Sequence, residues 1–116
     1  MITLYGIRNC DTCRKARKWL DNAGIAHRFH DFRADGLTPE TVAGWIAELG
    51  GDVLLNRRGT TWRKLTESER GRATGDGAAA LIAANPTLIK RPVFDLGDRR
   101  MVGFSDRTRA ALALSG

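Results

Sequence analysis

The hydrophobic pattern of this chain changes its period at the stretch NCDTC, and this change constrains the fold more than any other feature. Residues 2–7 (ITLYGI) alternate and are rich in β-forming side chains, which predicts a strand. Residues 11–22 follow a helical pattern instead. Three side chains recur there at spacings of three and four and so share one helix face: Cys13, Ala16 and Leu20. The chain therefore opens with a strand that leads into a helix, with Cys10 and Cys13 at the junction.

A second strand and a second helix are expected after this first pair. Gly24 ends the first helix, and residues 26–32 (AHRFHDF) again have a strand pattern. In the turn that follows, Thr38 is the expected N-cap and Pro39 the expected first helical residue. The Gly50-Gly51 pair ends this helix. Its buried face is an apolar stripe of four residues: Val42, Trp45, Ile46 and Leu49.

The middle of the chain predicts a basic loop and short helices. Residues 53–65 (VLLNRRGTTWRKL) hold a short apolar run and then the loop. Thr66 and Glu69 form a capping-box pattern, so a short helix should begin at Thr66. Residues 75–86 (GDGAAALIAANP) predict another helix, which closes before its terminal proline.

A hairpin and a last helix are expected in the remaining segment. Residues 91–97 (RPVFDLG) and 99–104 (RRMVGF) predict two strands joined by a Gly-Asp turn, and Ser105 is the expected N-cap of a helix that runs to about Leu114.

The resulting order of elements is β-α-β-α, a helical insertion, and β-β-α. This order is typical of an α/β protein with a thioredoxin-like fold. A chain of 116 residues fits one domain. We therefore expect a single domain over residues 1–116, with a helical insertion subdomain at about residues 50–85.

Composition and charge limit the cellular compartments and the classes of partner that we expect for this chain. Apolar residues make up 42% of the chain, no apolar run approaches 18 residues, and the first ten residues lack a signal-peptide layout. We therefore expect a cytoplasmic monomer without a membrane partner. The net charge is +6, mostly from Arg, but the basic residues are spread along the chain without a block. This spread favours a solvated basic surface over a nucleic-acid partner.

The cysteine pair has three possible roles, of which a redox pair is favoured. The unpaired N–H groups at the start of a helix stabilise a thiolate, so the pKa of Cys10 should fall. Arg14 and nearby cations should add to this effect, whereas the carboxylate of Asp11 should oppose it. Cys13 lies one turn further on, on the buried face, where it could resolve a mixed disulfide. Two cysteines in a reducing compartment also fit metal binding or catalysis better than a structural disulfide.

The two other roles are half of a zinc site and a pair of inert core cysteines. Cys10, Cys13, His27 and His30 spell C-x2-C-x13-H-x2-H, which is near a zinc-finger spacing. The two histidines are only three residues apart, however, and residues at i and i+3 of a strand point to opposite faces. We therefore expect no metal site and no bound cofactor.

Two further places carry residues that could bind an anion. Pro92 follows Arg91 at the start of a predicted strand, where it either marks the strand start or is a cis-proline beside the cysteine loop. In the second case Arg91 would meet a carboxylate or an oxyanion. The segment NRRGTTWRK is either an exposed loop or a place from which Arg57 or Arg58 reaches an anion near Cys10.

Five segments of the chain resemble the ArsC-like arsenate reductase family, and most closely its YffB branch. They extend over nearly the whole chain: LYGIRNCDTCRKARKWL, FHDFRADGL, LLNRRGTTWRKL, IKRPV and VGFSD. The resemblance implies a thioredoxin-like fold with a helical insertion. It also implies that Cys10 is the nucleophile, with Arg14, Arg58 and Arg91 as anion-binding residues and glutathione as the thiol partner.

The same resemblance implies three related activities. The first is a glutathione-dependent thiol-disulfide reductase that acts on a thiol, disulfide or oxyanion substrate. The second is an arsenate reductase proper, although arsenate reductases of this type carry an Arg on the last strand where this chain has Gly103. The third is an Spx-like redox-sensing regulator, in which the C-x-x-C pair is a switch and the partner is RNA polymerase.

Overall fold

The computed structural model describes residues 1–75 and 77–115, and within it the chain forms two compact units. Unit 1 combines Met1–Asp35 with the segment that begins at Arg91, and unit 2 is Gly36–Lys90. The helical segment expected at about 50–85 lies inside unit 2. One residue of the predicted helix segment 75–86, Asp76, lies outside the described residues.

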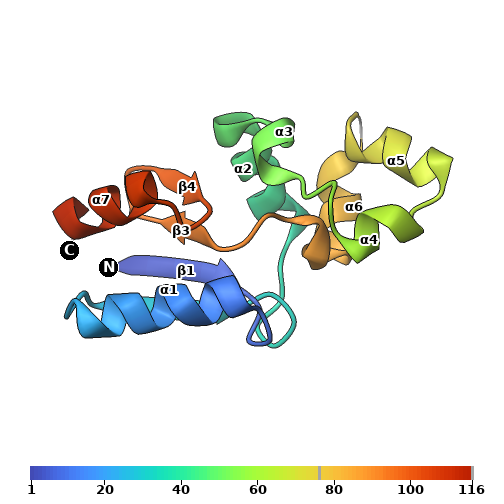
Figure 1. Cartoon of the computed structure of the whole chain (residues 1–116). Helices are drawn as coiled ribbons and strands as arrows, with labels where there is room; N and C mark the ends of the chain where they lie inside the picture. Colours follow the sequence, from blue (N-terminus) through green and yellow to red (C-terminus); the bar gives the residue numbers. More distant parts are fainter. Residues whose placement is uncertain (76, 116) are drawn as a thin grey trace. The chain divides into compact units, whose positions relative to one another are not determined.

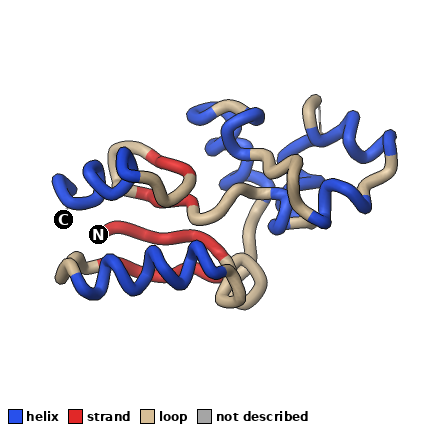
Figure 2. Tube along the Cα trace, in the orientation of Figure 1, coloured by secondary structure: helices blue, strands red, loops and turns tan. Residues whose placement is uncertain are grey.

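Unit 1 contains a mixed four-stranded sheet (Figures 1 and 2). Its strands are β1 (Ile2–Gly6), β2 (His27–Asp31), β3 (Val93–Asp95) and β4 (Arg100–Val102), in the spatial order β2-β1-β3-β4. β1 pairs with β2 in parallel and with β3 in antiparallel orientation, and β3 and β4 form the expected antiparallel hairpin. β1 is therefore central, and it lies between a strand from the start of the chain and one from near its end.

Two helices, α1 (Asp11–Asn22) and α7 (Asp106–Ser115), contribute side chains to the core of unit 1. Alternate residues of β1 face this core because strand side chains have a period of two. The core cluster joins both ends of the chain and consists of six residues: Ile2, Leu4, Ala16, Leu20, Phe94 and Leu112. The C-x-x-C helix is thus anchored through the face that the sequence predicts to be buried.

The ends of these helices follow the sequence pattern closely. Gly24, just beyond α1, has φ of 68°, which is a conformation that glycine adopts at little cost. Ser105 precedes α7, and its Oγ accepts a hydrogen bond from the Thr108 backbone N–H at 3.3 Å. Both boundaries were therefore readable from local residue chemistry.

Unit 2 is helical. Its elements are α2 (Pro39–Leu49), α3 (Gly51–Leu54), α4 (Thr60–Lys64), α5 (Glu67–Ala73), α6 (Ala78–Ala84) and the 3-10 turn η1 (Pro86–Leu88). Thr38 caps α2 by accepting a hydrogen bond from Thr41 N at 3.2 Å. The capping box of Thr66 and Glu69 begins α5, with both of its hydrogen bonds present. These features confirm the expected starts of α2 and α5.

Two short helices of unit 2 lie where the sequence predicts only an apolar run and a loop, so the prediction for this segment is incomplete. Gly50 has φ of 88° and ends α2, but α3 begins directly after it because the apolar run packs Leu54 inward. The basic loop contains α4. The turn before α4 forms because the Asn56 side chain accepts a hydrogen bond from Arg58 N at 3.1 Å. This Asn-based turn was a local signal that the hydrophobic pattern did not show.

The apolar residues of unit 2 form a core of their own. α2 and α6 pack closely together, and α6 also contacts α5. Within the part of this unit that the structure describes, an isolated antiparallel β-bridge pairs Leu55 with Ile89. Among the described helices of the whole chain, none is long and apolar enough to cross a membrane.

Candidate active site

Cys10 is the N-cap residue of α1, at the end of the short loop that follows β1. Its backbone is extended (φ −112°, ψ 121°), and its carbonyl accepts the first helical hydrogen bond, from Arg14 N at 2.9 Å. The side chain is half-buried and carries a free thiol. Cys10 is therefore both reachable from solvent and placed where the first free N–H groups of the helix gather.

The pKa of Cys10 lies below its ordinary value. Burial is the largest single influence and raises this pKa, but several hydrogen-bond donors together outweigh it. They are the backbone N–H of Cys13, the Arg91 side chain and the Cys13 thiol, and the charge of Arg91 adds to them. The sulfur of Cys10 is therefore the group of the pair that ionises first.

The pKa of Cys13 is shifted in the opposite direction. It is only 1% exposed, and burial, with a smaller contribution from the nearby Cys10 charge, raises its pKa to about 12. Its sulfur lies against Gly6 of β1, where a Cβ would collide with Sγ. The two cysteines therefore form an asymmetric pair, in which the outer thiol has a lowered pKa and the buried inner thiol a raised one.

Arg91 and Pro92 lie beside the cysteine loop. The peptide bond between them is cis, and Pro92 is buried directly before β3. Val93, the next residue, pairs with Tyr5 of β1, so β3 carries Arg91 to the end of the sheet where Cys10 lies. Of the two alternatives for Pro92, the structure has the cis-proline.

Arg14, which the sequence predicts to add positive potential near Cys10, has a carboxylate partner on its own helix. Its guanidinium forms an exposed ion pair with Asp11, one turn back on α1. The carboxylate that was expected to oppose the Cys10 thiolate is therefore neutralised by the cation that was expected to support it. Neither residue is among the groups that set the pKa of Cys10, and Arg91 supplies the positive charge instead.

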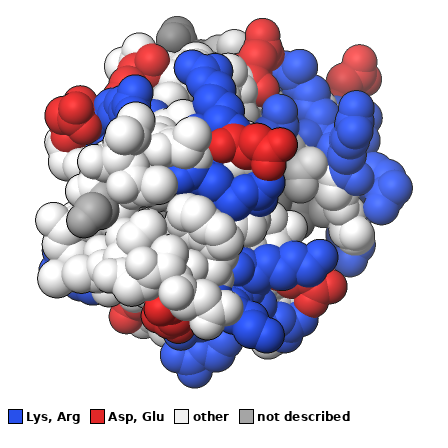
Figure 3. Space-filling view, turned by 60° about the vertical axis from the view of Figure 1, so that its left-hand side comes forward, with Lys and Arg blue, Asp and Glu red and all other residues white. Residues whose placement is uncertain are grey.

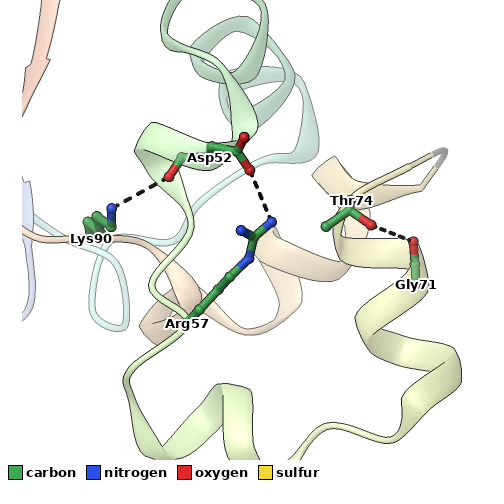
Figure 4. A network of polar contacts seen from close by, with 5 residues as sticks. All are labelled: Asp52, Arg57, Gly71, Thr74 and Lys90. Atoms are coloured by element: carbon green, nitrogen blue, oxygen red, sulfur yellow. Dashed lines mark hydrogen bonds and ion pairs between the residues drawn. The ribbon is translucent and has the colours of Figure 1, made fainter.

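Arg57 and Arg58 belong to unit 2, where they border a hollow of about 360 Å³. Arg57 donates to Asp52 Oδ1 at 3.0 Å, and Lys90 Nζ lies 3.5 Å from the Asp52 carbonyl oxygen (Figure 4). The hollow is lined by six residues: Asp52, Leu55, Asn56, Arg57, Arg58 and Lys90. Three cations and the Asp52 carboxylate thus border one hollow. Asp52 pairs with Arg57, so Arg58 and Lys90 are the cations that best suit a small anion there.

The histidines do not join the cysteines. His27 pairs with Ile2 at the far end of β1, and its Nδ1 lies 2.9 Å from the Ile25 carbonyl oxygen. The His30 ring packs against Tyr5, with 4.8 Å between ring centroids. Within residues 1–75 and 77–115, no three His, Cys, Asp or Glu side chains are grouped as metal ligands would be.

Asp31 is a residue of this region that the sequence analysis did not single out. It ends β2, is 7% exposed, and accepts hydrogen bonds from three backbone N–H groups, one of them in the cysteine loop. An aspartate at the end of a strand and before a turn was the only available signal.

The charged side chains on the surface do not form one basic patch on the face that Figure 3 draws. Lys and Arg lie there in several groups, with Asp and Glu between them.

The sheet order, the C-x-x-C loop at the start of α1 and the cis-proline before β3 together define a thioredoxin-like fold with two free cysteines at the start of its first helix. The model of the ArsC family matches residues 5–112 of the chain. The chain therefore belongs to the ArsC family.

Two solved structures and one sequence relative illustrate this kinship. The YFFB (PA3664) protein has a TM-score of 0.86 and 46% identity, over 97% of this chain and 99% of that one. An arsenate reductase (ArsC) related protein from Brucella melitensis has a TM-score of 0.76 and 43% identity, over 95% and 92% of the two chains. The global transcriptional regulator Spx of Streptococcus agalactiae is 31% identical over 97% of this chain and 83% of its own length.

Proposed function

We propose that this protein is a glutathione-dependent thiol-disulfide reductase that uses Cys10 as its nucleophile. The observation that carries the proposal is the ionisable, half-buried Cys10 beside Arg91, with a protonated Cys13 behind it. Only the thiolate form of cysteine attacks a disulfide, and a lowered pKa raises the fraction of thiolate at neutral pH. The membership of the ArsC family supports the same class of chemistry.

The reaction proceeds in two exchanges. With a mixed disulfide R–S–S–G, the Cys10 thiolate attacks the glutathione sulfur, a Cys10–S–S–G bond forms, and RS⁻ leaves and takes up a proton. A second glutathione, as GS⁻, then attacks the glutathione sulfur of that intermediate. Oxidised glutathione forms, and the Cys10 thiolate is regenerated. One substrate disulfide is reduced and one glutathione disulfide is produced.

Glutathione resolves the intermediate in this scheme rather than Cys13. Burial raises the pKa of Cys13 to about 12, so its thiol stays protonated at neutral pH and offers little thiolate for attack. The Cys10 charge that contributes to this value disappears in the mixed disulfide, but burial, the largest cause, remains. The Cys13 thiol instead donates to Cys10, which lowers the pKa of Cys10.

The cations provide the binding part of the proposal. Arg91, which already contacts the sulfur, would receive a carboxylate of glutathione, and the cis-proline would hold the backbone of the bound peptide in an extended form. Arg58 and its neighbours at the hollow of unit 2 would provide a separate site for a small anion within that unit. Of the predicted anion-binding residues, Arg14 is the least suitable, because Asp11 already neutralises its charge.

Arsenate is a less suitable substrate for this site. Gly103, where arsenate reductases of this type are expected to carry an Arg, has φ of 90°, and its N–H donates to the Pro92 carbonyl at 2.8 Å. A side chain at residue 103 would be strained in this conformation. One cation of an oxyanion site is therefore missing, and the tight turn at this place does not favour its return.

The test is a coupled assay with glutathione, glutathione reductase and a small glutathione mixed disulfide, in which NADPH consumption is measured. We expect turnover by the wild-type protein and by Cys13→Ser, and none by Cys10→Ser. Equal loss in both variants would show that the reaction passes through a Cys10–Cys13 disulfide. No turnover by a wild-type protein whose Cys10 is rapidly alkylated would refute the reductase.

A redox-sensing regulator is the second candidate, and the kinship with Spx favours it. In that case oxidation would join Cys10 to Cys13, and the reduced and oxidised forms would bind RNA polymerase differently. A binding measurement with the purified polymerase separates the two candidates. Redox-dependent binding without NADPH turnover supports the regulator, whereas turnover without binding supports the enzyme.

A further inference from the structure

The carboxylate of Asp31 is buried and ionised, and the reaction above does not use it. Its Oδ1 accepts hydrogen bonds from Arg33 N at 2.8 Å and Ala34 N at 3.2 Å, and its Oδ2 accepts one from Arg8 N at 3.1 Å. The first two bonds close the turn after β2, and the third crosses to the loop between β1 and Cys10. One side chain therefore ties two loops together.

The charge state of Asp31 fits this arrangement. Burial raises the pKa of the carboxyl, but the N–H groups of Arg33, Ala34 and Arg8, together with the Arg8 charge, outweigh burial and lower it. The carboxyl is therefore ionised at neutral pH, and both of its oxygens are acceptors. A protonated carboxyl or an amide could not offer two full acceptors to these three donors.

The loop that Asp31 holds is short and is fixed from two sides. The Ile7 N–H interacts with the buried Cys13 sulfur, and the next N–H, that of Arg8, bonds to Asp31. The neighbouring Gly6 carbonyl accepts a bond from Phe32 N at 2.8 Å. Cys10 comes two residues after Arg8, so these bonds restrain the loop that carries its sulfur.

We propose that Asp31 is a positioning residue that holds the loop of Cys10, so that the sulfur stays within reach of Arg91 and the Cys13 N–H. The proposal rests on the role of Cys10 in the proposed function, but it concerns the state of the sulfur before any disulfide arrives. It can therefore fail or succeed independently of the reductase reaction.

The direction in which the pKa of Cys10 shifts when the Asp31 charge is removed distinguishes a positioning role from a simple effect of charge. Removal of a nearby negative charge, with the geometry unchanged, would stabilise the thiolate and lower the pKa of Cys10. Loss of the loop geometry would weaken the contacts of the sulfur with Arg91 and the Cys13 N–H and raise this pKa. The two explanations predict shifts in opposite directions.

The experiment compares Asp31→Asn with Asp35→Asn by measuring the rate of Cys10 alkylation by iodoacetamide as a function of pH, in a Cys13→Ser background. The amide introduced by Asp31→Asn would keep one acceptor for the turn but would present an NH₂ group to Arg8 N. The control removes the same charge from the same turn, and the amide introduced by Asp35→Asn can still accept the bond from Asp31 N that the structure shows at 2.9 Å.

We expect the alkylation pKa of Cys10 to rise by about one unit in Asp31→Asn, which reduces the thiolate fraction about tenfold below the pKa. In Asp35→Asn we expect no rise. An unchanged or lowered pKa in Asp31→Asn, even with a lower melting temperature, would overturn the proposal and leave Asp31 as a structural residue only.

A second measurement uses the wild-type chain, so it remains decisive if Asp31→Asn does not fold. We expect the Arg8 amide to exchange with deuterium more slowly by at least about tenfold than the neighbouring Asn9 amide, since a hydrogen-bonded amide must open before it exchanges. Equally fast exchange at the two amides would show that the bond to Asp31 is not held in solution, and would overturn the proposal.

Discussion

At the scale of single residues, the site depends on how closely β1 approaches α1. Gly6 is the strand residue that faces Cys13, and no other residue type leaves space for the buried sulfur there. The sequence placed both cysteines correctly at a strand-helix junction. It did not show that Arg14 would be neutralised by Asp11, because a side chain with two possible partners chooses between them by geometry.

The first prediction concerns Gly6. We expect Gly6→Ala to reduce the free energy of unfolding by about 1–3 kcal/mol, because the new methyl group must displace Cys13 or the strand. Gly44→Ala, at an exposed helix position with open space around it, should instead increase stability by about 0.5–1 kcal/mol. Urea unfolding measures both. Equal effects of the two substitutions would contradict the close packing.

The second prediction concerns Arg91. Because its side chain donates to the Cys10 sulfur and carries a charge, Arg91→Met should raise the pKa of Cys10. The rate of alkylation at neutral pH should then fall, and at high pH it should approach the wild-type rate. Arg14→Met is the matched control and should leave the pH profile nearly unchanged. If the pH profile of alkylation shifts in Arg14→Met but not in Arg91→Met, then Arg91 is not the cation that lowers the pKa of Cys10.

At the scale of elements, the boundaries that the sequence predicted are those set by local chemistry. Thr38, Thr66 and Ser105 all begin helices, because each side-chain oxygen satisfies an N–H group that the helix leaves free. α4 was missed because its turn depends on one Asn-based hydrogen bond within a basic segment. The tie made by Asp31 was also missed, because it joins two loops that are distant in sequence.

The third prediction concerns the capping box of α5. Thr66→Ala should cost about 1 kcal/mol, because the Glu69 N–H loses its acceptor at an early turn of the helix. Thr74→Ala, at the other end of the same helix, removes only an exposed hydroxyl that donates to the Gly71 carbonyl and should cost less (Figure 4). Thermal unfolding of the two variants measures the difference, and a larger cost at Thr74 would refute the capping argument.

At the scale of the whole molecule, unit 1 is formed from both ends of the chain, and unit 2 is inserted between them. The thioredoxin-like fold could be predicted because the order of strands and helices is readable from the sequence. The boundaries of unit 2 were harder to predict from the sequence. α2 follows β2 as the second helix of the pattern, yet it packs with α6 of the helical unit. Such packing partners are decided by tertiary contacts rather than by periodicity.

The fourth prediction tests the contribution of the last helix to the core of unit 1. Leu112 is fully buried in the core cluster, so Leu112→Ala should cost about 2–5 kcal/mol. Leu114 lies on the same helix but is 88% exposed, and Leu114→Ala should have little effect. Chemical denaturation of both variants measures these costs. A small effect at Leu112 would mean that α7 is dispensable for the sheet.

The pairing of β1 with β3 has a consequence for synthesis on the ribosome. β1 and the cysteine loop leave the exit tunnel early, whereas β3 and Arg91 leave it only after the whole of unit 2. Until then the nascent chain has no guanidinium at the sulfur and no third strand beside the first. Until β3 has been synthesised, Cys10 should therefore lack the share of its lowered pKa that Arg91 contributes, and it should be a weaker nucleophile than in the folded unit 1.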